Sequence, residues 1–414
     1  MQYVAHPSSV NGRLLAPASK SAAQRAIAIA SLAEGTSVIV RPGSCDDVQA
    51  AVSVCKQLGV HIEEHDHQMH ITGGIRPPGN ELNCGESGLG IRMFSGVAAT
   101  LNEEIVLTGK GSLMNRPMSM VEQSLLAMGV SCQTTGGRLP IFIKGPFPGG
   151  AATIDGSQSS QVLTGILIAS PMANSDVVLS VNDLKSREYV DITTRIMKLF
   201  GVNVTNNNYK EFIIPSRQRY KATQYRVEGD WSGASFLLVA GAIAGQISIE
   251  NLDLSSAQPD RKIMEALQDA GAICITDNNT VEVKKGTTAL QAFSFDATHC
   301  PDLFPPLAAL AANCKGKSSI LGVSRLKSKE SDRAATIMDT FGKLGLDISL
   351  DRDAMIISGG QIKGADIHSH GDHRIAMAGA IAALNADRKV TIGHADAVNK
   401  SYPEFYKDLE SITS

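Results

Sequence analysis

The chain lacks the features that would mark a membrane, secreted or nucleic-acid-binding protein. None of its apolar runs approaches transmembrane length, and residues 1–10 lack the charged and apolar regions of a signal peptide. Aromatic residues make up only 5% of the chain, and a net charge of −3 leaves no basic footprint for nucleic acid or a membrane surface. We therefore expect a cytoplasmic protein without nucleic-acid or membrane partners.

Cysteine and histidine are present, but not in patterns that form disulfides or bind metals. The seven cysteines include no CxxC pair, so we expect them to be small core side chains in a reducing compartment. The four histidines between residues 61 and 70 fall in an expected solvated hairpin, and His368, His370 and His373 have no matching carboxylate or thiolate spacing. The glycines of residues 85–90 and 316–318 depart from dinucleotide and P-loop spacings. We therefore predict neither a metal nor a cofactor.

One sequence pattern recurs six times, at a spacing of about 70 residues, and determines the expected architecture. Each copy opens with a polar or charged cluster, and the following segment is apolar on nearly every face, as in a buried helix. A β-branched strand, a second helix and a hairpin come next. Each unit is therefore predicted to be βαβαββ, with the sixth truncated at the C-terminus. The openings are residues 19–21, 86–88, 159–161, 230–232, 301–302 and 372–374.

Turn residues separate the elements of each repeat. A glycine follows most of the second helices, where a left-handed backbone would cap the helix. Gly136-Gly137 and residues 206–208 have the composition of hairpin turns. The capping glycines are Gly59, Gly129, Gly201, Gly271 and Gly345.

The length of the chain indicates two domains. A chain of 414 residues exceeds the size at which one hydrophobic core keeps growing. The repeats divide most simply into three and three, with a boundary near residues 227–230. Three repeats of the same sense would bring three buried helix N-termini to one side of each lobe, where they favour anions.

Eight basic side chains lie at or near repeat-equivalent helix starts. Each alone would be interpreted as a solvated charge, but together they indicate a site for substrates with several phosphates and carboxylates. Asp302 and Glu330 interrupt the cationic pattern, either as capping or ion-pairing carboxylates or as proton donors and acceptors. No serine–histidine–acid set is evident, which argues against a covalent nucleophile. The basic residues are Lys20, Arg25, Arg92, Arg116, Lys329, Arg333, Arg374 and Lys400.

The motifs at these positions resemble those of the 5-enolpyruvylshikimate-3-phosphate (EPSP) synthase family, in order from about residue 14 to residue 406. The resemblance implies two lobes of three βαβαββ units each, the two-lobed inside-out α/β barrel, around an interlobe site. It places residues 14–228 in one lobe and residues 1–13 with 229–414 in the other, so that the first residues pair with the C-terminal part. The matching segments are residues 19–25, 85–92, 115–117, 159–161, 186–191, 329–333, 372–374 and 400–403.

The resemblance also implies a reaction. The enolpyruvyl group of phosphoenolpyruvate passes to the 5-hydroxyl of shikimate 3-phosphate through a tetrahedral intermediate, with release of phosphate, on the route to chorismate and the aromatic amino acids. By position, Asp302, Glu330 and Lys20 would be catalytic, with His373 assisting. Shikimate 3-phosphate would be bound by Ser21, Arg25, Ser159, Ser160, Gln161, Ser186, Tyr189, Asp302, Arg325 and Lys329. Phosphoenolpyruvate would be bound by Lys20, Gly88, Arg92, Arg116, Gln161, Arg333, Arg374 and Lys400.

Some positions depart from the usual family pattern, and these leave sensitivity to glyphosate open. Glu86 stands in place of a common asparagine, Leu89 in place of a threonine, and Arg325 in place of an asparagine. An added carboxylate at residue 86 would weaken phosphate binding unless it is paired or turned away.

Three other interpretations fit the sequence less well. The sister transferases acting on UDP-N-acetylglucosamine usually have asparagine where Ser21 follows Lys20, and a cysteine in the segment that is residues 110–115 here. RNA 3′-phosphate cyclases would favour base-stacking aromatics. A non-enzymatic repeat scaffold would not explain acids set among cations. Nothing in the sequence indicates an obligate assembly, so we expect a monomer.

Overall fold

The computed structural model describes residues 1–414, which form two compact units. The N-terminal unit is Lys20–Val227, and the C-terminal unit combines Met1–Ser19 with Glu228–Ser414. The expected boundary at residue 14 is wrong by six residues. It falls inside strand β2 (Val10–Leu15), which pairs along its whole length with β15 (Gly245–Glu250) of the C-terminal unit.

The N-terminal unit contains three four-stranded sheets, with the strand orders β14-β3-β5-β4, β6-β7-β9-β8 and β10-β11-β13-β12. Its strands are β3 (Thr36–Val40), β4 (His61–His65), β5 (Gln68–Thr72), β6 (Glu81–Asn83), β7 (Glu104–Thr108), β8 (Ser131–Thr135), β9 (Arg138–Lys144), β10 (Gly150–Asp155), β11 (Val177–Asn182), β12 (Thr205–Asn207), β13 (Glu211–Ile214) and β14 (Gln224–Arg226). Its helices are α1 (Lys20–Leu32), α2 (Asp46–Gln57), α3 (Gly88–Ala98), α4 (Ser119–Ala127), α5 (Ser160–Ala169) and α6 (Glu188–Leu199), with the 3-10 turns η1 (Gly111–Asn115) and η2 (Ser170–Met172).

The C-terminal unit contains sheets of order β16-β17-β15-β2, β18-β19-β21-β20 and β1-β23-β22. Its remaining strands are β1 (Gln2–Ala5), β16 (Ile273–Asp277), β17 (Thr280–Lys284), β18 (Ser294–Asp296), β19 (Lys317–Leu321), β20 (Asp347–Asp351), β21 (Ala354–Ser358), β22 (Asp366–His368) and β23 (Val390–Gly393). Its helices are α7 (Trp231–Ala244), α8 (Ile263–Asp269), α9 (Phe304–Ala312), α10 (Arg333–Lys343), α11 (His373–Ala383) and α12 (Phe405–Ile412), with the 3-10 turns η3 (Pro259–Lys262), η4 (Pro301–Leu303), η5 (Val323–Arg325) and η6 (Ala395–Lys400).

The sheets share one pairing pattern, as the sequence repeat predicts. Each begins with a parallel pair, such as β10 with β11 or β18 with β19, and continues through an antiparallel hairpin. The sixth sheet has only three strands, and the N-terminal strand β1 pairs antiparallel with β23 there. The predicted α/β class, with three repeats in each unit, is confirmed.

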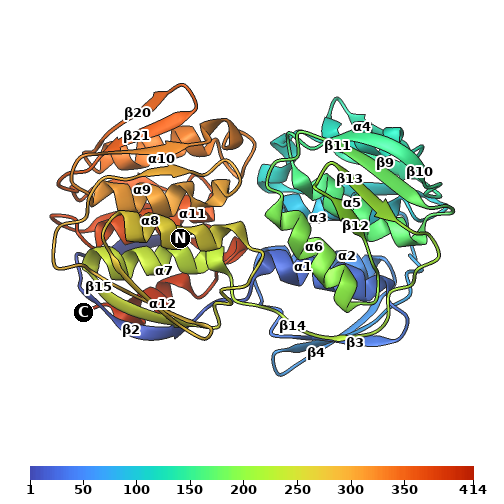
Figure 1. Ribbon diagram of the computed structural model, residues 1–414, viewed down its shortest axis with the longest axis horizontal. Helices are drawn as coiled ribbons and strands as arrows, with labels where there is room; N and C mark the ends of the chain where they lie inside the picture. The colour runs from blue at the N-terminus through green and yellow to red at the C-terminus, as the bar shows by residue number, and fades with distance from the viewer. The chain divides into compact units, whose positions relative to one another are not determined.

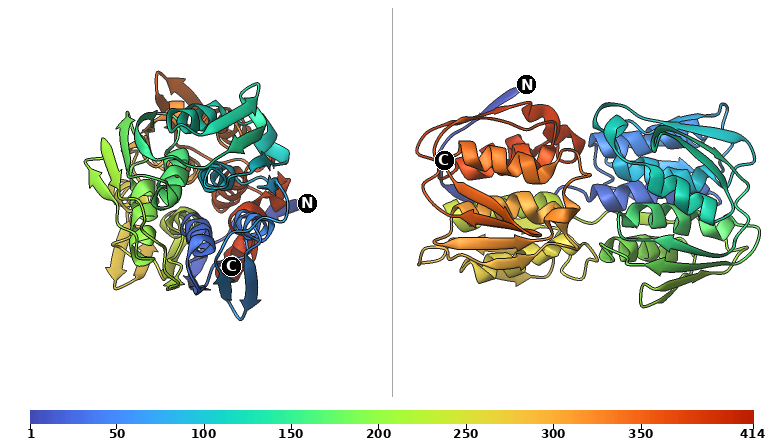
Figure 2. Two further views of the ribbon diagram at one scale, coloured as in Figure 1. Left: turned by 90° about the vertical axis from the view of Figure 1, so that its right-hand side faces the viewer. Right: turned by 90° about the horizontal axis from the view of Figure 1, so that it is seen from above.

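Within each unit the first helix of each repeat is almost wholly buried, and the sheets lie outside these helices, which are α1, α3 and α5 in one unit and α7, α9 and α11 in the other (Figure 1 and Figure 2). Small residues allow this packing because they let helix backbones approach closely. A Cβ atom added to Gly96 of α3 would lie 2.2 Å from the carbonyl oxygen of Gly165 in α5. Every residue of α3 is buried, as expected for a helix that is apolar on nearly every face.

The turn predictions hold in most places. All five predicted capping glycines have a positive φ between 76° and 91°. Gly136 and Gly137 both have a positive φ and join β8 to β9, as a tight hairpin requires. The turn after β12 differs, because residues 206 and 207 belong to the strand and the turn begins at Asn208. No helix in the structure is both long enough and apolar enough to span a membrane.

Candidate active site

The first turns of three buried helices meet in the N-terminal unit. The Ser87 hydroxyl, which caps α3, donates a 2.8 Å hydrogen bond to Oε1 of Gln24 in α1. Arg92 of α3 donates from Nη1 to Oε1 of Gln161 in α5, also at 2.8 Å. The repeat therefore brings the first three openings together, as the sequence predicts. Free N–H groups at such helix starts favour anions.

Arg116 lies over the start of α3. Its guanidinium lies beside Gly88, where a side chain would collide with it. A Cβ atom added to Gly88 would lie 2.3 Å from Nη1 of Arg116 and 3.4 Å from Nη1 of Arg92. Both arginines are buried, with 6% and 4% of their surfaces exposed. Two guanidinium groups held at a helix N-terminus have the charge and donor geometry that phosphate or carboxylate groups prefer.

Lys20, the first residue of α1, forms an ion pair that the sequence did not predict. Its Nζ lies 2.8 Å from Oδ2 of Asp47 in the first turn of α2. Both side chains are largely buried, so this pair fixes the ammonium more firmly than a surface pair would. Asp47 thus orients a predicted catalytic residue.

Arg25 is held inside the N-terminal unit. Its guanidinium donates to Oγ1 of Thr193 at 2.8 Å, to Oγ1 of Thr164 at 3.3 Å and to the carbonyl of Ser21 at 2.7 Å. Burial lowers the pKa of Arg25 to about 10. These contacts tie α1 to α5 and α6, a structural role that the sequence interpretation did not include.

Four hydroxyl-bearing residues that are predicted to bind shikimate 3-phosphate lie at helix starts of the same unit. Ser159 caps α5 by accepting a hydrogen bond from the Gln161 amide at 3.2 Å, and Ser160 is the first residue of that helix. Ser186 is buried with a left-handed backbone (φ 53°) just before α6, and Tyr189 is in the first turn of α6. The hydroxyl groups thus lie at the N-terminal ends of α5 and α6, the two helices that Arg25 links by hydrogen bonds.

The C-terminal unit centres on the guanidinium of Arg333, which three carboxylates surround. Its Nε lies 2.8 Å from Oδ2 of Asp372, its Nη1 lies 2.6 Å from Oδ1 of Asp302, and its Nη2 lies 2.5 Å from Oε2 of Glu330. Arg333 is 1% exposed and Asp372 is fully buried. This network joins η4, α10 and the start of α11.

Asp302 receives two further cations. Nη2 of Arg374 lies 3.0 Å and Nζ of Lys329 lies 3.3 Å from its carboxylate oxygens. Burial alone would raise the pKa of Asp302, but Arg374, Lys329 and Arg333 outweigh it and hold this pKa well below its usual range. Asp302 is therefore ionised and can accept hydrogen bonds. The resulting cluster pairs three carboxylates with three cations.

Three other predicted site residues belong to this unit: His373, Arg325 and Lys400. His373 is buried as the first residue of α11, with Nδ1 3.7 Å from Oδ1 of Asp372. Arg325 ends η5, and its charge contributes to lowering the pKa of Lys329, for which burial is the main cause. Lys400 is buried at the end of η6, which packs against α11.

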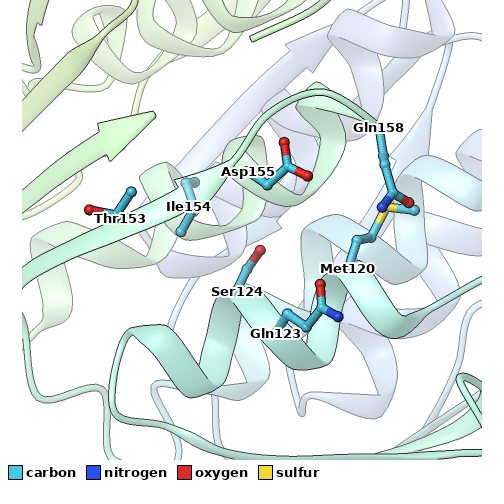
Figure 3. Close-up of a pocket in the computed structure, with 7 residues that line it drawn as sticks. All are labelled: Met120, Gln123, Ser124, Thr153, Ile154, Asp155 and Gln158. Atoms are coloured by element: carbon cyan, nitrogen blue, oxygen red, sulfur yellow. The ribbon is translucent and has the colours of Figure 1, made fainter. Parts of the chain in front are cut away.

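Two other features concern metal binding and a cavity that lies outside these clusters of charged residues. No group of three or more His, Cys, Asp or Glu side chains in the chain is arranged to hold a metal ion. A cavity of about 220 Å³ lies between α4 and β10 in the N-terminal unit, lined by side chains such as Ser124, Asp155 and Gln158 (Figure 3). None of its lining residues is a predicted site residue.

The structure adds partners that local sequence patterns could not reveal. Asp47 lies 27 positions from Lys20, and Asp372 lies 39 positions from Arg333. Asp372 belongs to the sixth opening predicted from the sequence, whereas no sequence pattern singled out Asp47. The pairing of these carboxylates with Lys20 and Arg333 required the folded backbone.

Comparisons with solved structures identify the fold. The structure of EPSP synthase from Acinetobacter baumannii superposes with a TM-score of 0.84 and 27% identity, covering 100% of this chain and 98% of that one. The enolpyruvyl transferase NikO from Streptomyces tendae superposes with a TM-score of 0.81 at 15% identity, covering 100% of this chain and 97% of its own, a likeness of fold alone. The fold is thus that of the enolpyruvyl transferases.

Similar sequences show which family with this fold the chain belongs to. A model of the family EPSP synthase (3-phosphoshikimate 1-carboxyvinyltransferase) matches residues 4–409. Proteins named 3-phosphoshikimate 1-carboxyvinyltransferase are 37% identical in Methanocorpusculum labreanum, over 100% of this chain and 98% of the relative, and 35% identical in Clostridium novyi, over 98% and 96%. The chain belongs to the EPSP synthase family, which confirms the resemblance seen in its motifs.

Proposed function

We propose that this chain transfers the enolpyruvyl group of phosphoenolpyruvate to the 5-hydroxyl of shikimate 3-phosphate, releasing phosphate, in the biosynthesis of aromatic amino acids. The observation that carries the proposal is the Arg333 cluster, in which two carboxylates suited to proton transfer, Asp302 and Glu330, are held among cations. A match to the EPSP synthase family over residues 4–409 supports it.

Binding roles follow from the chemistry of the two substrates. The hydroxyl and amide groups of Ser21, Ser159, Ser160, Gln161, Ser186 and Tyr189 would bind shikimate 3-phosphate, with Lys329 and Arg325 adding positive charge. Arg25 would contribute through N–H groups not used by its three internal bonds, since a guanidinium has five donors. The phosphate and carboxylate of phosphoenolpyruvate would bind to Lys20, Arg92, Arg116, Arg333, Arg374 and Lys400, with the backbone of Gly88 and the amide of Gln161 beside them.

The addition step forms a bond between the 5-hydroxyl oxygen and C2 of phosphoenolpyruvate, while C3 takes up a proton. Asp302 would accept or orient the hydroxyl proton, and Glu330 with Lys20 would supply the proton to C3. An anion bound to Arg333 and Arg374 would weaken their hold on Asp302 and raise its pKa. Substrate binding would thus make Asp302 a better proton acceptor than it is in the free protein.

The elimination step reverses the proton transfer at C3. The tetrahedral intermediate loses a proton from its methyl group and the C2–oxygen bond to phosphate breaks, so that the enolpyruvyl double bond forms again. Glu330 and Lys20 would now accept the proton, with His373 assisting, and the arginines would stabilise the departing phosphate. We further propose that the protein acts as a cytoplasmic monomer without a metal or cofactor.

The proposal is tested by mixing the protein with phosphoenolpyruvate and shikimate 3-phosphate and following phosphate release. UDP-N-acetylglucosamine in place of shikimate 3-phosphate serves as the matched acceptor control. We expect phosphate release with shikimate 3-phosphate as the acceptor and none with UDP-N-acetylglucosamine. Release only with the nucleotide sugar, or with neither acceptor, would refute the proposed function.

A further inference from the structure

Glu86 is an acidic side chain beside the basic residues of the N-terminal unit, and the proposed reaction gives it no role. It directly precedes Ser87, the residue that caps α3. A carboxylate that faced a bound phosphate would weaken binding by repulsion. The contacts of Glu86 indicate another use.

The Glu86 carboxylate binds the start of η1. Its Oε2 accepts hydrogen bonds from both the backbone N–H and the hydroxyl of Ser112, each at 3.1 Å. Gly111, which begins η1, has a φ of 57°, and a Cβ atom there would lie 2.1 Å from Oε1 of Glu86. The glycine therefore leaves the space that the carboxylate fills.

The other end of the same segment places Arg116. The Arg116 amide donates to the carbonyl of Leu113 at 3.1 Å, so the residue continues directly from η1. Its guanidinium then lies over Gly88, only two positions after Glu86. Residues 86–88 thus contact both ends of η1: Glu86 binds its first turn, and Gly88 lies beside the guanidinium of Arg116, which follows η1.

We propose that Glu86 is a positioning residue for Arg116. By fixing the first turn of η1, its carboxylate holds the Arg116 guanidinium at the start of α3, where the anionic substrate binds. The inference rests on the proposed function, since it takes Arg116 as a ligand of phosphoenolpyruvate. It also explains how a negative charge is tolerated there, because the carboxylate is turned toward Ser112.

Steady-state kinetics of three variants test the inference. Glu86→Ala removes the acceptor, Glu86→Gln keeps an acceptor oxygen at the same reach, and Glu103→Ala removes an exposed glutamate of the same unit as the matched control. We expect Glu86→Ala to raise the KM for phosphoenolpyruvate about tenfold, with kcat and the KM for shikimate 3-phosphate within about twofold. Glu86→Gln should recover most of the loss, and Glu103→Ala should match the wild type. A lower KM for phosphoenolpyruvate in both Glu86 variants would overturn the inference, because it would show that the carboxylate only repels the substrate.

Hydrogen–deuterium exchange tests the same contact without relying on activity. In Glu86→Ala the amides of residues 112–116 should exchange faster than in the wild type and in Glu103→Ala, because Ser112 loses its acceptor. Unchanged exchange there, or faster exchange with an unchanged KM for phosphoenolpyruvate, would overturn the positioning role. An inactive wild type would refute the proposed function instead, while the exchange comparison would still report on Glu86.

Discussion

Replacing Asp372 should destabilise the C-terminal unit, because this carboxylate has two separate roles. Its Oδ2 accepts from Nε of Arg333 at 2.8 Å and from the Ser331 hydroxyl at 3.1 Å. Its Oδ1 caps α11 by accepting from the Arg374 amide at 3.0 Å. Asp372→Ala removes both roles, whereas Asp372→Asn retains a side chain that caps helices well.

The size of the effect follows from what the substitution leaves behind. Removing one partner of a buried ion pair costs about 3–5 kcal/mol when the other charge is left alone. Arg333 keeps Asp302 and Glu330, so the cost is closer to that of one unsatisfied buried donor, about 1–3 kcal/mol. Loss of the cap adds about 1 kcal/mol. We therefore expect Asp372→Ala to lower the free energy of unfolding by about 2–4 kcal/mol, and Asp372→Asn by about 1 kcal/mol less.

The chain provides its own probe for this measurement. Its single tryptophan, Trp231, is fully buried at the start of α7 and lies in the same unit as Asp372. Urea unfolding followed by tryptophan fluorescence therefore reports on this unit, and circular dichroism checks the fold before denaturant is added.

Asp351→Ala, which removes an exposed aspartate from β20 of the same unit, is the matched control and should change stability by less than about 0.5 kcal/mol. A free energy of unfolding for Asp372→Ala within about 1 kcal/mol of the wild-type value would contradict both roles of this carboxylate. Equal destabilisation by the alanine and asparagine variants would show that the capping role contributes nothing.

Three further predictions concern residues of the proposed site. Lys20→Met and Glu330→Ala should each reduce phosphate release at least about 100-fold while circular dichroism stays unchanged, and near-normal rates in either variant would exclude its role in proton transfer. Gly88→Ala should raise the KM for phosphoenolpyruvate with little loss of stability, because the new Cβ displaces the flexible end of Arg116; an unchanged KM would show that this position of Arg116 is not required. The pKa of Asp302 is held below its usual value, so the stability it contributes is present above about pH 4 and is lost as the pH falls toward the lower, folded-state pKa. Acid unfolding followed by Trp231 fluorescence should therefore be less steep in Asp302→Asn, and identical steepness would count against the ion pairs.

Much of the fold could be predicted because its signals are local and repeat. Five glycines after second helices adopt the left-handed backbone that their positions indicated, since only a residue without Cβ adopts it at little cost. The helix starts at Lys20, Ser160 and His373 lie within the predicted openings. The boundary at residue 14 failed because a strand joins a sheet through long-range pairing, and β2 finds its partner more than 200 positions away.

The candidate site, like the fold, was predictable from the sequence only in part. Sequence by itself determined which residues carry charge at the helix starts, because each opening places a polar cluster before a buried apolar segment. It did not determine what those charges contact. Only the tertiary structure showed that Asp47 binds Lys20, that Glu86 binds the turn before Arg116, and that Asp372 binds Arg333. Ion pairs and capping bonds depend on distances of about 3 Å between distant segments, and such distances exist only once the repeats have packed together.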